Sequence, residues 1–133
     1  MKSVNAIILN KEKKFLVIKR KDGIHGGKWA FPGGIVEKNE TNEQALKREV
    51  KEETGLEITK IIKKIAIYHY PRENKSDTQG TSYLVSVKST RVNINDEVEE
   101  FRWVSIEELE ELDHIRGLED EALKVISLLH NTL

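Results

Sequence analysis

Apolar residues follow two different spacings along the chain. They form short runs or alternate with polar residues near the N-terminus and in much of residues 58–104, and they recur at helical spacing in residues 41–54 and 119–129. Alternation is typical of strands, and a repeat of three to four residues is typical of helices. The pattern predicts strands over residues 4–9, 15–18, 58–70, 81–87 and 98–104. Residues 58–70 are predicted to form one or two strands with a bend.

The connections are predicted from turn-forming and polar residues. Residues 10–14 form a polar turn that would join the first two strands as a hairpin. Residues 71–80 are predicted to be a polar loop, and residues 91–96 a turn. Residues 23–34 contain five glycines, which predicts either a flexible loop or backbone that approaches a ligand closely.

Capping signals delimit the predicted helices. Thr41 and Gln44 have capping-box spacing, and Gly55 is a C-terminal stop, so a helix is expected from about residue 41 to 55. A second capping box begins at Ser105 and predicts a short helix to about Leu112. A last helix is expected over residues 119–129. This order of elements predicts an α+β fold, a mixed sheet with helices on its faces.

Composition narrows the class of protein. A chain of 133 residues fits a single domain over residues 1–133. The net charge of −1 does not favour binding to nucleic acid or to a membrane surface, and the absence of cysteine excludes disulfides and thiolate chemistry. No apolar run is long enough to span a bilayer, and the N-terminus does not resemble a signal peptide. We expect a cytoplasmic monomer or homodimer.

The helix over residues 41–55 carries three crowded carboxylates. Glu49, Glu52 and Glu53 are related by spacings of three and four residues, so they should share one side of the helix. Like charges there would repel one another, and a divalent cation would resolve the conflict. Oxygen ligands without His or Cys suit Mg²⁺, with Mn²⁺ as a substitute. The alternative is an ordinary solvated face of a charged helix.

The stretch from Gly34 to Leu56 resembles the Nudix box, G-x5-E-x7-R-E-U-x-E-E-x-G-U, in which U is an apolar aliphatic residue. Every fixed position matches, and a chance match is on the order of one in ten million. The chain therefore resembles the Nudix hydrolases, especially small, MutT-like members. The resemblance implies an α/β/α sandwich around a mixed β-sheet. The matching residues are Gly34, Glu40, Arg48, Glu49, Val50, Glu52, Glu53, Gly55 and Leu56.

The resemblance also implies roles for residues of the box. Glu49, Glu52 and Glu53 are expected to bind metal and activate water. Arg48 is expected to orient a neighbouring glutamate, and it can pair with Glu52 at i+4. Glu40 is interpreted as mainly structural.

Further site residues lie outside the box helix. The resemblance implies that the carbonyl of Gly33 ligates metal and that basic residues such as Arg20 receive phosphates. Lys28 and the backbone of Gly34 complete the candidate substrate-binding set. MutT-like enzymes often carry a metal-binding glutamate six residues before the tryptophan of the last strand, and the resemblance therefore implies Glu97, six residues before Trp103, as a metal-binding or catalytic residue. Glu99 and Glu100 are close competitors, and an acidic surface run is the alternative.

The function implied by the resemblance is Mg²⁺-dependent hydrolysis of a nucleoside diphosphate linked to a further group X. Nucleoside triphosphates and ADP-ribose are the candidate substrates. Pro71, fifteen residues after Leu56, resembles a mark of ADP-ribose hydrolases, or it simply ends a strand. Residues 113–118 lack the asparagine with which MutT-type enzymes read an oxidised guanine. The alternatives are a non-catalytic nucleotide sensor and a domain that processes RNA ends.

Overall fold

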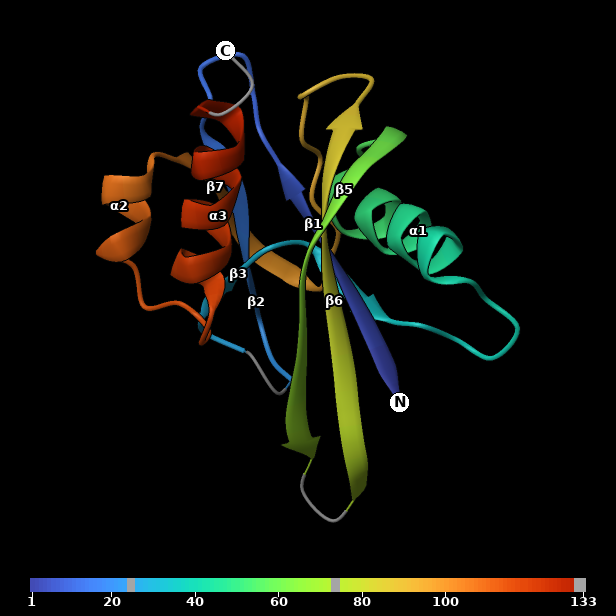
Figure 1. Cartoon of the computed structure of the whole chain (residues 1–133). Coiled ribbons are helices and arrows are strands. Elements are labelled where there is room, and N and C mark those ends of the chain that lie inside the picture. The colour runs from blue at the N-terminus through green and yellow to red at the C-terminus, as the bar shows by residue number, and fades with distance from the viewer. Residues whose placement is uncertain (24–25, 73–74, 131–133) are drawn as a thin grey trace.

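A computed structural model describes residues 1–23, 26–72 and 75–130. Along the described chain a group of strands is followed by a helix, further strands and then two helices, which is an α+β order (Figure 1). The strands are β1 (Lys2–Ile8), β2 (Phe15–Arg20), β3 (Trp29–Ala30), β4 (Gly33–Ile35), β5 (Ile58–Arg72), β6 (Lys75–Val87) and β7 (Val98–Val104). The helices are α1 (Asn42–Thr54), α2 (Ile106–Glu110) and α3 (Leu118–His130).

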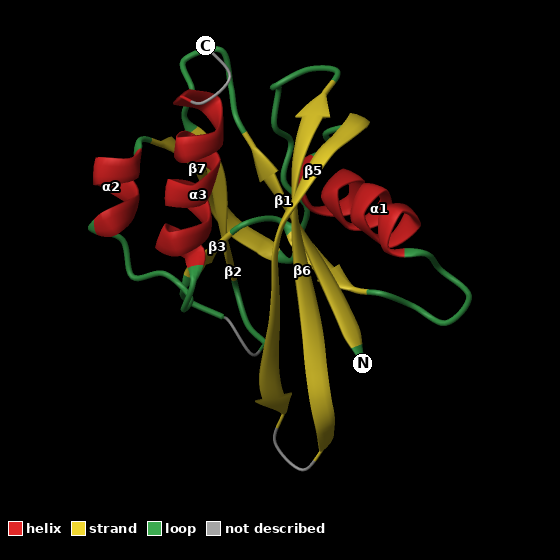
Figure 2. Cartoon of the chain, in the orientation of Figure 1, coloured by secondary structure: helices red, strands yellow, loops and turns green. Residues whose placement is uncertain are grey.

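The strands form two sheets. One sheet has the order β4-β1-β6-β5 and is mixed, because β1 runs parallel to β6 while the other pairs are antiparallel. The other sheet is antiparallel and has the order β3-β2-β7. Figure 2 shows helix α1 on one side of the strands and helices α2 and α3 on the other. The predicted α+β class, with helices on both sides of a mixed sheet, is confirmed.

Two apolar cores hold the helices against the strands. On the α1 side, the buried helix residues Ala45, Leu46 and Val50 pack with residues of β1, β2 and β6. On the other side, α2 and α3 contribute a second set of buried side chains to a cluster with Phe15 and Phe31. Burying one large aliphatic side chain contributes roughly 1.5–3 kcal/mol. The core on the α1 side therefore fixes the position of the helix that carries the three glutamates.

Helix α1 has the caps that the sequence predicts. Thr41 accepts a hydrogen bond from the backbone N–H of Gln44, and the Gln44 side chain accepts one from the backbone of Thr41. Gly55 ends the helix in the left-handed conformation, with φ of 75°. The second predicted capping box, Ser105 with Glu108, begins α2, which ends two residues earlier than predicted. Helix α3 matches the predicted last helix within one residue at each end.

The predicted hairpin of the first two strands is wrong. Strands β1 and β2 belong to different sheets and share only the bridge between Leu9 and Phe15. The polar turn itself is present, because the Asn10 side chain accepts a hydrogen bond from the backbone of Lys14. Both edges of β1 are instead paired with β4 and β6, which leaves no edge for β2.

The predicted polar loop over residues 71–80 is also wrong in large part. Strand β5 continues to Arg72 and β6 starts at Lys75, and the two strands pair from Ile58↔Val87 to Arg72↔Lys75. Register shifts in this pairing replace the predicted bend. Cross-strand backbone hydrogen bonds need no apolar alternation, so a polar ribbon escapes a pattern-based prediction.

Residues 26–35 contain two short strands that the sequence pattern does not predict, β3 and β4. Each pairs over only two or three residues. His25, interpreted from the sequence as a loop residue, lies outside the described residues. Within the described part of the chain, no helix is long and apolar enough to cross a membrane.

Candidate active site

The three glutamates of α1 differ sharply in exposure. The side chain of Glu53 is 2% exposed, that of Glu49 is 16% exposed and that of Glu52 is 54% exposed. Glu53 therefore points inward and Glu52 points to solvent. The three carboxylates are not left unpaired, because Arg20 contacts Glu53 and Arg48 contacts Glu49 and Glu52.

Glu53 is held by the strands that lie under α1. Its Oε1 accepts hydrogen bonds from the backbone N–H of Gly33 at 2.9 Å and from Nη2 of Arg20 at 3.1 Å, and its Oε2 accepts one from Arg20 Nε at 2.9 Å. The same Nη2 donates to the carbonyl oxygen of Gly33 at 2.7 Å. Arg20 thus contacts both the carboxylate and the carbonyl that the family resemblance assigns to metal.

Arg48 joins the remaining acidic residues. Its guanidinium contacts Glu40 at 2.6 and 2.9 Å, Glu49 at 2.8 Å and Glu52 at 3.5 Å. Its Nη2 also donates to the carbonyl of Ile35 at 3.1 Å. The expected i+4 pair with Glu52 is present, but it is longer than the contacts with Glu40 and Glu49. Arg48 therefore fixes the loop before α1 to the helix and orients Glu49.

The arginines and the degree of burial shift the pKa values of the carboxyls in opposite directions. Hydrogen bonds from Arg48 lower the pKa of Glu40 to about 2, so this residue stays ionised. Hydrogen bonding to Glu40 raises the pKa of Arg48 above its usual range. Burial raises the pKa of Glu53 to about 7 despite the nearby Arg20, and burial also raises the pKa of Glu49. The interpretation of Glu40 as structural fits its contacts with Arg48 and with the backbone of Glu37.

Two glycines allow the strands to approach these carboxylates. A Cβ atom at Gly34 would lie 2.4 Å from the carboxyl carbon of Glu49. A Cβ atom at Gly33 would lie 2.0 Å from the carbonyl oxygen of Val4, on β1. Real Cβ contacts are not this short. A larger residue at Gly33 would therefore push β4 away from β1, and one at Gly34 would displace the Glu49 carboxylate. The predicted close backbone approach is therefore present at the box.

Within residues 1–23, 26–72 and 75–130, no three carboxylate or histidine side chains converge closely enough to hold a metal ion. The reason is visible in the contacts, since Arg20 and Arg48 lie among the glutamates. The donors still suit Mg²⁺ or Mn²⁺, because they are carboxylate oxygens and one backbone carbonyl. The guanidinium of Arg20 bridges Glu53 and the Gly33 carbonyl. These oxygens therefore already stabilise one positively charged group.

The other predicted residues lie at different distances from this cluster. Glu97 is exposed in the turn before β7, and its carbonyl accepts a hydrogen bond from the backbone of Lys21, next to Arg20. This places the Glu97 backbone near the end of β2 from which Arg20 reaches α1. Lys28 is exposed and precedes Trp29, the first residue of β3.

Sequence reasoning missed a buried polar pair on the α3 side of the mixed sheet. Glu121 is buried and accepts a hydrogen bond from Ser82, and its burial raises the pKa of its carboxyl. Nearby on the same sheet, the Tyr68 hydroxyl donates to Asn5 at 3.0 Å. The sequence pattern of α3 does not predict that Glu121 is buried, because this residue lies in an acidic first turn that resembles the solvated start of a helix.

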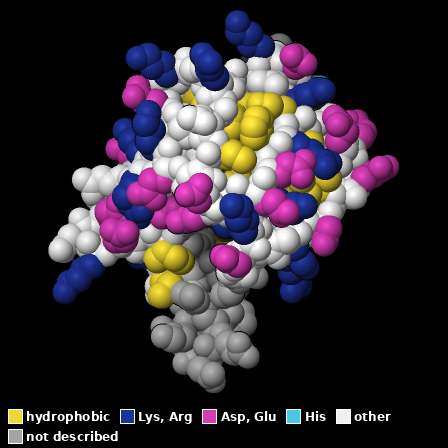
Figure 3. All heavy atoms as spheres, turned by 180° about the vertical axis from the view of Figure 1, so that it is seen from behind, with side chains coloured by type: hydrophobic (Ala, Val, Ile, Leu, Met, Phe, Trp, Pro, Cys, Tyr) yellow, Lys and Arg dark blue, Asp and Glu magenta, His cyan; other side chains and the backbone are white. Residues whose placement is uncertain are grey.

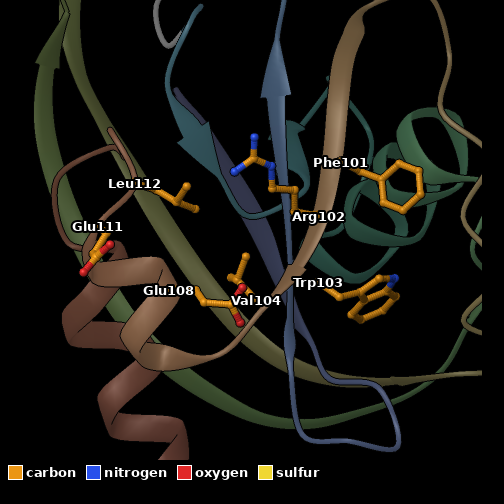
Figure 4. A pocket seen from close by; sticks show the side chains of 7 residues that line it. All are labelled: Phe101, Arg102, Trp103, Val104, Glu108, Glu111 and Leu112. Carbon is orange, nitrogen blue, oxygen red and sulfur yellow. The ribbon is translucent and has the colours of Figure 1, made fainter.

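A groove of about 700 Å³ lies between β7 and α2. Figure 4 shows Phe101 and Trp103 pointing to the side of β7 where α1 lies, while Glu108 and Glu111 project from α2 and the turn that follows it. No residue of the Nudix box lines this groove. Figure 3 shows acidic and basic side chains interspersed on the back of the molecule, as expected for a chain with a net charge near zero.

The comparisons with known proteins identify the family of this chain. A family model described as the NUDIX domain matches residues 1–126. An ADP-ribose pyrophosphatase of Methanocaldococcus jannaschii is 34% identical over 116 residues, which cover 85% of this chain and 68% of that protein. The nucleoside triphosphatase NudI of Klebsiella pneumoniae is 34% identical over 102 residues, 68% of this chain and 71% of that protein.

The solved structures give the same result. The MutT protein of Methanosarcina mazei Go1 superposes with a TM-score of 0.80 at 26% identity, covering 93% of this chain and 91% of that one. The fold and the box together define a Nudix hydrolase. The chain belongs to the Nudix family, and the expected membership among enzymes that act on acid anhydrides is confirmed.

Proposed function

We propose that this protein is a Mg²⁺-dependent pyrophosphohydrolase that cleaves the diphosphate bond of a nucleoside diphosphate linked to a further group X. The observation that carries the proposal is the arrangement of Glu53, the Gly33 carbonyl and Glu49 at one end of α1 and β4. These oxygen donors lie where glycine lets the backbone approach the helix closely. Family members are generally dependent on a divalent metal, and this donor set fits one.

The residues of the candidate site have separate roles in the proposed reaction. Glu53 and the Gly33 carbonyl would hold Mg²⁺, together with Glu49 and the exposed Glu52. When bound, Mg²⁺ would withdraw charge from the phosphorus and the leaving phosphate. Arg48 keeps Glu49 oriented through the 2.8 Å contact. Arg20 and Lys28 supply positive charge for the phosphates, and the backbone of Gly34 completes the substrate-binding set.

Glu49 is the first candidate for the group that takes the proton from the attacking water. Its pKa is raised by burial, and a higher pKa makes a carboxylate a stronger base. Glu97 is the second candidate, because its backbone lies beside β2 at the end that carries Arg20. A pH–rate profile of Glu49→Gln and Glu97→Gln distinguishes the two. In the wild type, activity should increase with pH as the base loses its proton. The base is the residue whose substitution by glutamine abolishes this increase.

Two substrate classes follow from the named relatives. The Methanocaldococcus jannaschii relative is named as acting on ADP-ribose, and the Klebsiella pneumoniae relative as acting on nucleoside triphosphates. The position of Pro71 supports ADP-ribose, and the missing asparagine in residues 113–118 argues against 8-oxo-dGTP. A small nucleotide, rather than nucleic acid, is the proposed partner.

The test is a panel of ADP-ribose, nucleoside triphosphates, nucleotide sugars and dinucleoside polyphosphates, each with Mg²⁺ and with EDTA. We expect metal-dependent release of a nucleoside monophosphate from at least one of them. Glu53→Gln is the matched control, since it removes the negative charge but keeps the size of the side chain and an oxygen that can accept from the Gly33 N–H. The proposal is wrong if no compound is cleaved, or if cleavage is the same in EDTA.

A further inference from the structure

Arg20 makes contacts that a phosphate-binding residue does not require. It lies on β2, 33 residues before Glu53 in the sequence, and its guanidinium crosses from the strand to the helix to reach that carboxylate. One nitrogen, Nη2, contacts Glu53 at 2.8–3.1 Å and the Gly33 carbonyl at 2.7 Å. These are two of the oxygen groups that the proposed function assigns to Mg²⁺.

A metal ion bound to these oxygens would compete with the guanidinium, because two cations only a few ångströms apart repel each other. Glu53 Oε1 already accepts from the Gly33 N–H as well as from Arg20, and its side chain is 2% exposed. A cation would therefore have to approach the Glu53 carboxylate from the side on which the Arg20 guanidinium now lies. The Arg20 side chain is 21% exposed, so it can turn toward solvent without unpacking the core.

We propose that Arg20 is a resident counter-ion of the metal site, which holds the ligands in place in the metal-free protein and is displaced when Mg²⁺ binds. The inference rests on the proposed function, because it needs Glu53 and the Gly33 carbonyl to be metal ligands. A buried carboxylate without a cation would be costly, so Arg20 keeps the empty site folded. Displacement turns the guanidinium outward, where it is free to contact the phosphates of a substrate that arrives with or after the metal.

The consequence is a competition that can be measured without turnover. Removing a positive charge a few ångströms from the metal should strengthen metal binding by about tenfold or more. The probe is Mn²⁺ alone, and the readout is the loss of its free-ion electron paramagnetic resonance signal at about pH 8.5. We expect Arg20→Gln to bind Mn²⁺ at least about tenfold more tightly than wild type, with Arg20→Lys between the two.

Lys19→Gln is the matched control for loss of one positive charge from β2. Lys19 contacts Glu99 and the Trp29 ring rather than Glu53, so this variant should bind Mn²⁺ within about twofold of wild type. Equal or weaker Mn²⁺ binding by Arg20→Gln than by wild type would overturn the inference.

A second measurement uses the wild-type protein, so it does not depend on how well a variant folds. The Nε–H of Arg20, which donates to Glu53, should give a protected side-chain nitrogen–proton NMR signal, assigned by its loss in Arg20→Lys. Saturating Mg²⁺ should shift this signal and speed its exchange with water. An unchanged signal in the Mg²⁺ complex would show that Arg20 stays on Glu53.

The two proposals fail in different ways. If wild type binds Mn²⁺ and cleaves nucleotides but Arg20→Gln binds Mn²⁺ no more tightly, only the displacement of Arg20 is wrong. If wild type binds no Mn²⁺ at millimolar concentration, the metal site is wrong and the displacement falls with it.

Discussion

Replacing Glu53 with glutamine should make the metal-free protein more stable relative to wild type as the pH rises from about 4.5 to 7. Burial raises the pKa of this carboxyl from 4.5 to about 7 in the folded protein. In that range the folded protein holds a proton that the unfolded chain has released. Since the unfolded state binds fewer protons, wild-type stability falls as pH rises. The glutamine side chain of the variant does not titrate, so the variant escapes this loss.

The size of the effect follows from the shift. Each unit of pKa corresponds to about 1.4 kcal/mol, so the difference in unfolding free energy between variant and wild type should change by about 3 kcal/mol across the range. Below about pH 4.5 the carboxyl is neutral in both states, and the pH-dependent part of the difference disappears. Other titrating groups are common to both proteins and cancel in the comparison. Glutamine can still accept the hydrogen bond from Gly33.

The assay is urea unfolding of both proteins in EDTA, at half-unit steps from about pH 4.5 to about pH 8.5. Glu52→Gln, at an exposed position of the same helix, is the control for loss of a carboxylate and should not reproduce the slope. A difference between Glu53→Gln and wild type that stays constant with pH would refute the reasoning. It would show that Arg20 compensates the buried charge fully.

Three further outcomes are expected. Glu52→Gln should lower kcat by about a hundredfold or more in a steady-state assay, the scale of losing one charge-stabilising group, while the circular dichroism spectrum stays unchanged. Glu97→Gln should reduce turnover more than Glu99→Gln, and equal effects would place Glu97 on an ordinary acidic surface. Gly34→Ala should lower the activity, because its Cβ would lie 2.4 Å from the Glu49 carboxyl carbon and would displace that carboxylate. Normal activity in that variant would show that the Glu49 position is not fixed by β4.

The sequence predicts the local parts of this fold well. Helix α1 and its two caps follow from Thr41, Gln44 and Gly55, because each signal acts within a few residues. The strand predicted over residues 98–104 matches β7 in both limits. Pairing between strands is not local, so the pattern of residues 4–18 predicts one hairpin although its two strands belong to different sheets.

The local features of the candidate site are likewise predictable from the sequence, and its long-range contacts are not. The spacing of the three glutamates and of Arg48 is visible in the sequence, and the contact of Arg48 with Glu52 follows from it. The difference in their burial is not visible, because it depends on how α1 lies over β2 and β4. The pairing of Arg20 with Glu53 spans 33 residues and arises only when the two sheets and the helix are assembled.

Hydrolysis in water enriched in ¹⁸O tests the central claim most directly. The active compound from the substrate panel is incubated with Mg²⁺, and the isotope content of each phosphate-containing product is read by mass spectrometry. Water attack on phosphorus predicts one ¹⁸O atom in the phosphate group of one product, at a rate that falls to background in EDTA and in Glu53→Gln. Products without ¹⁸O in any phosphate group, or labelling that continues undiminished in EDTA, would contradict the account.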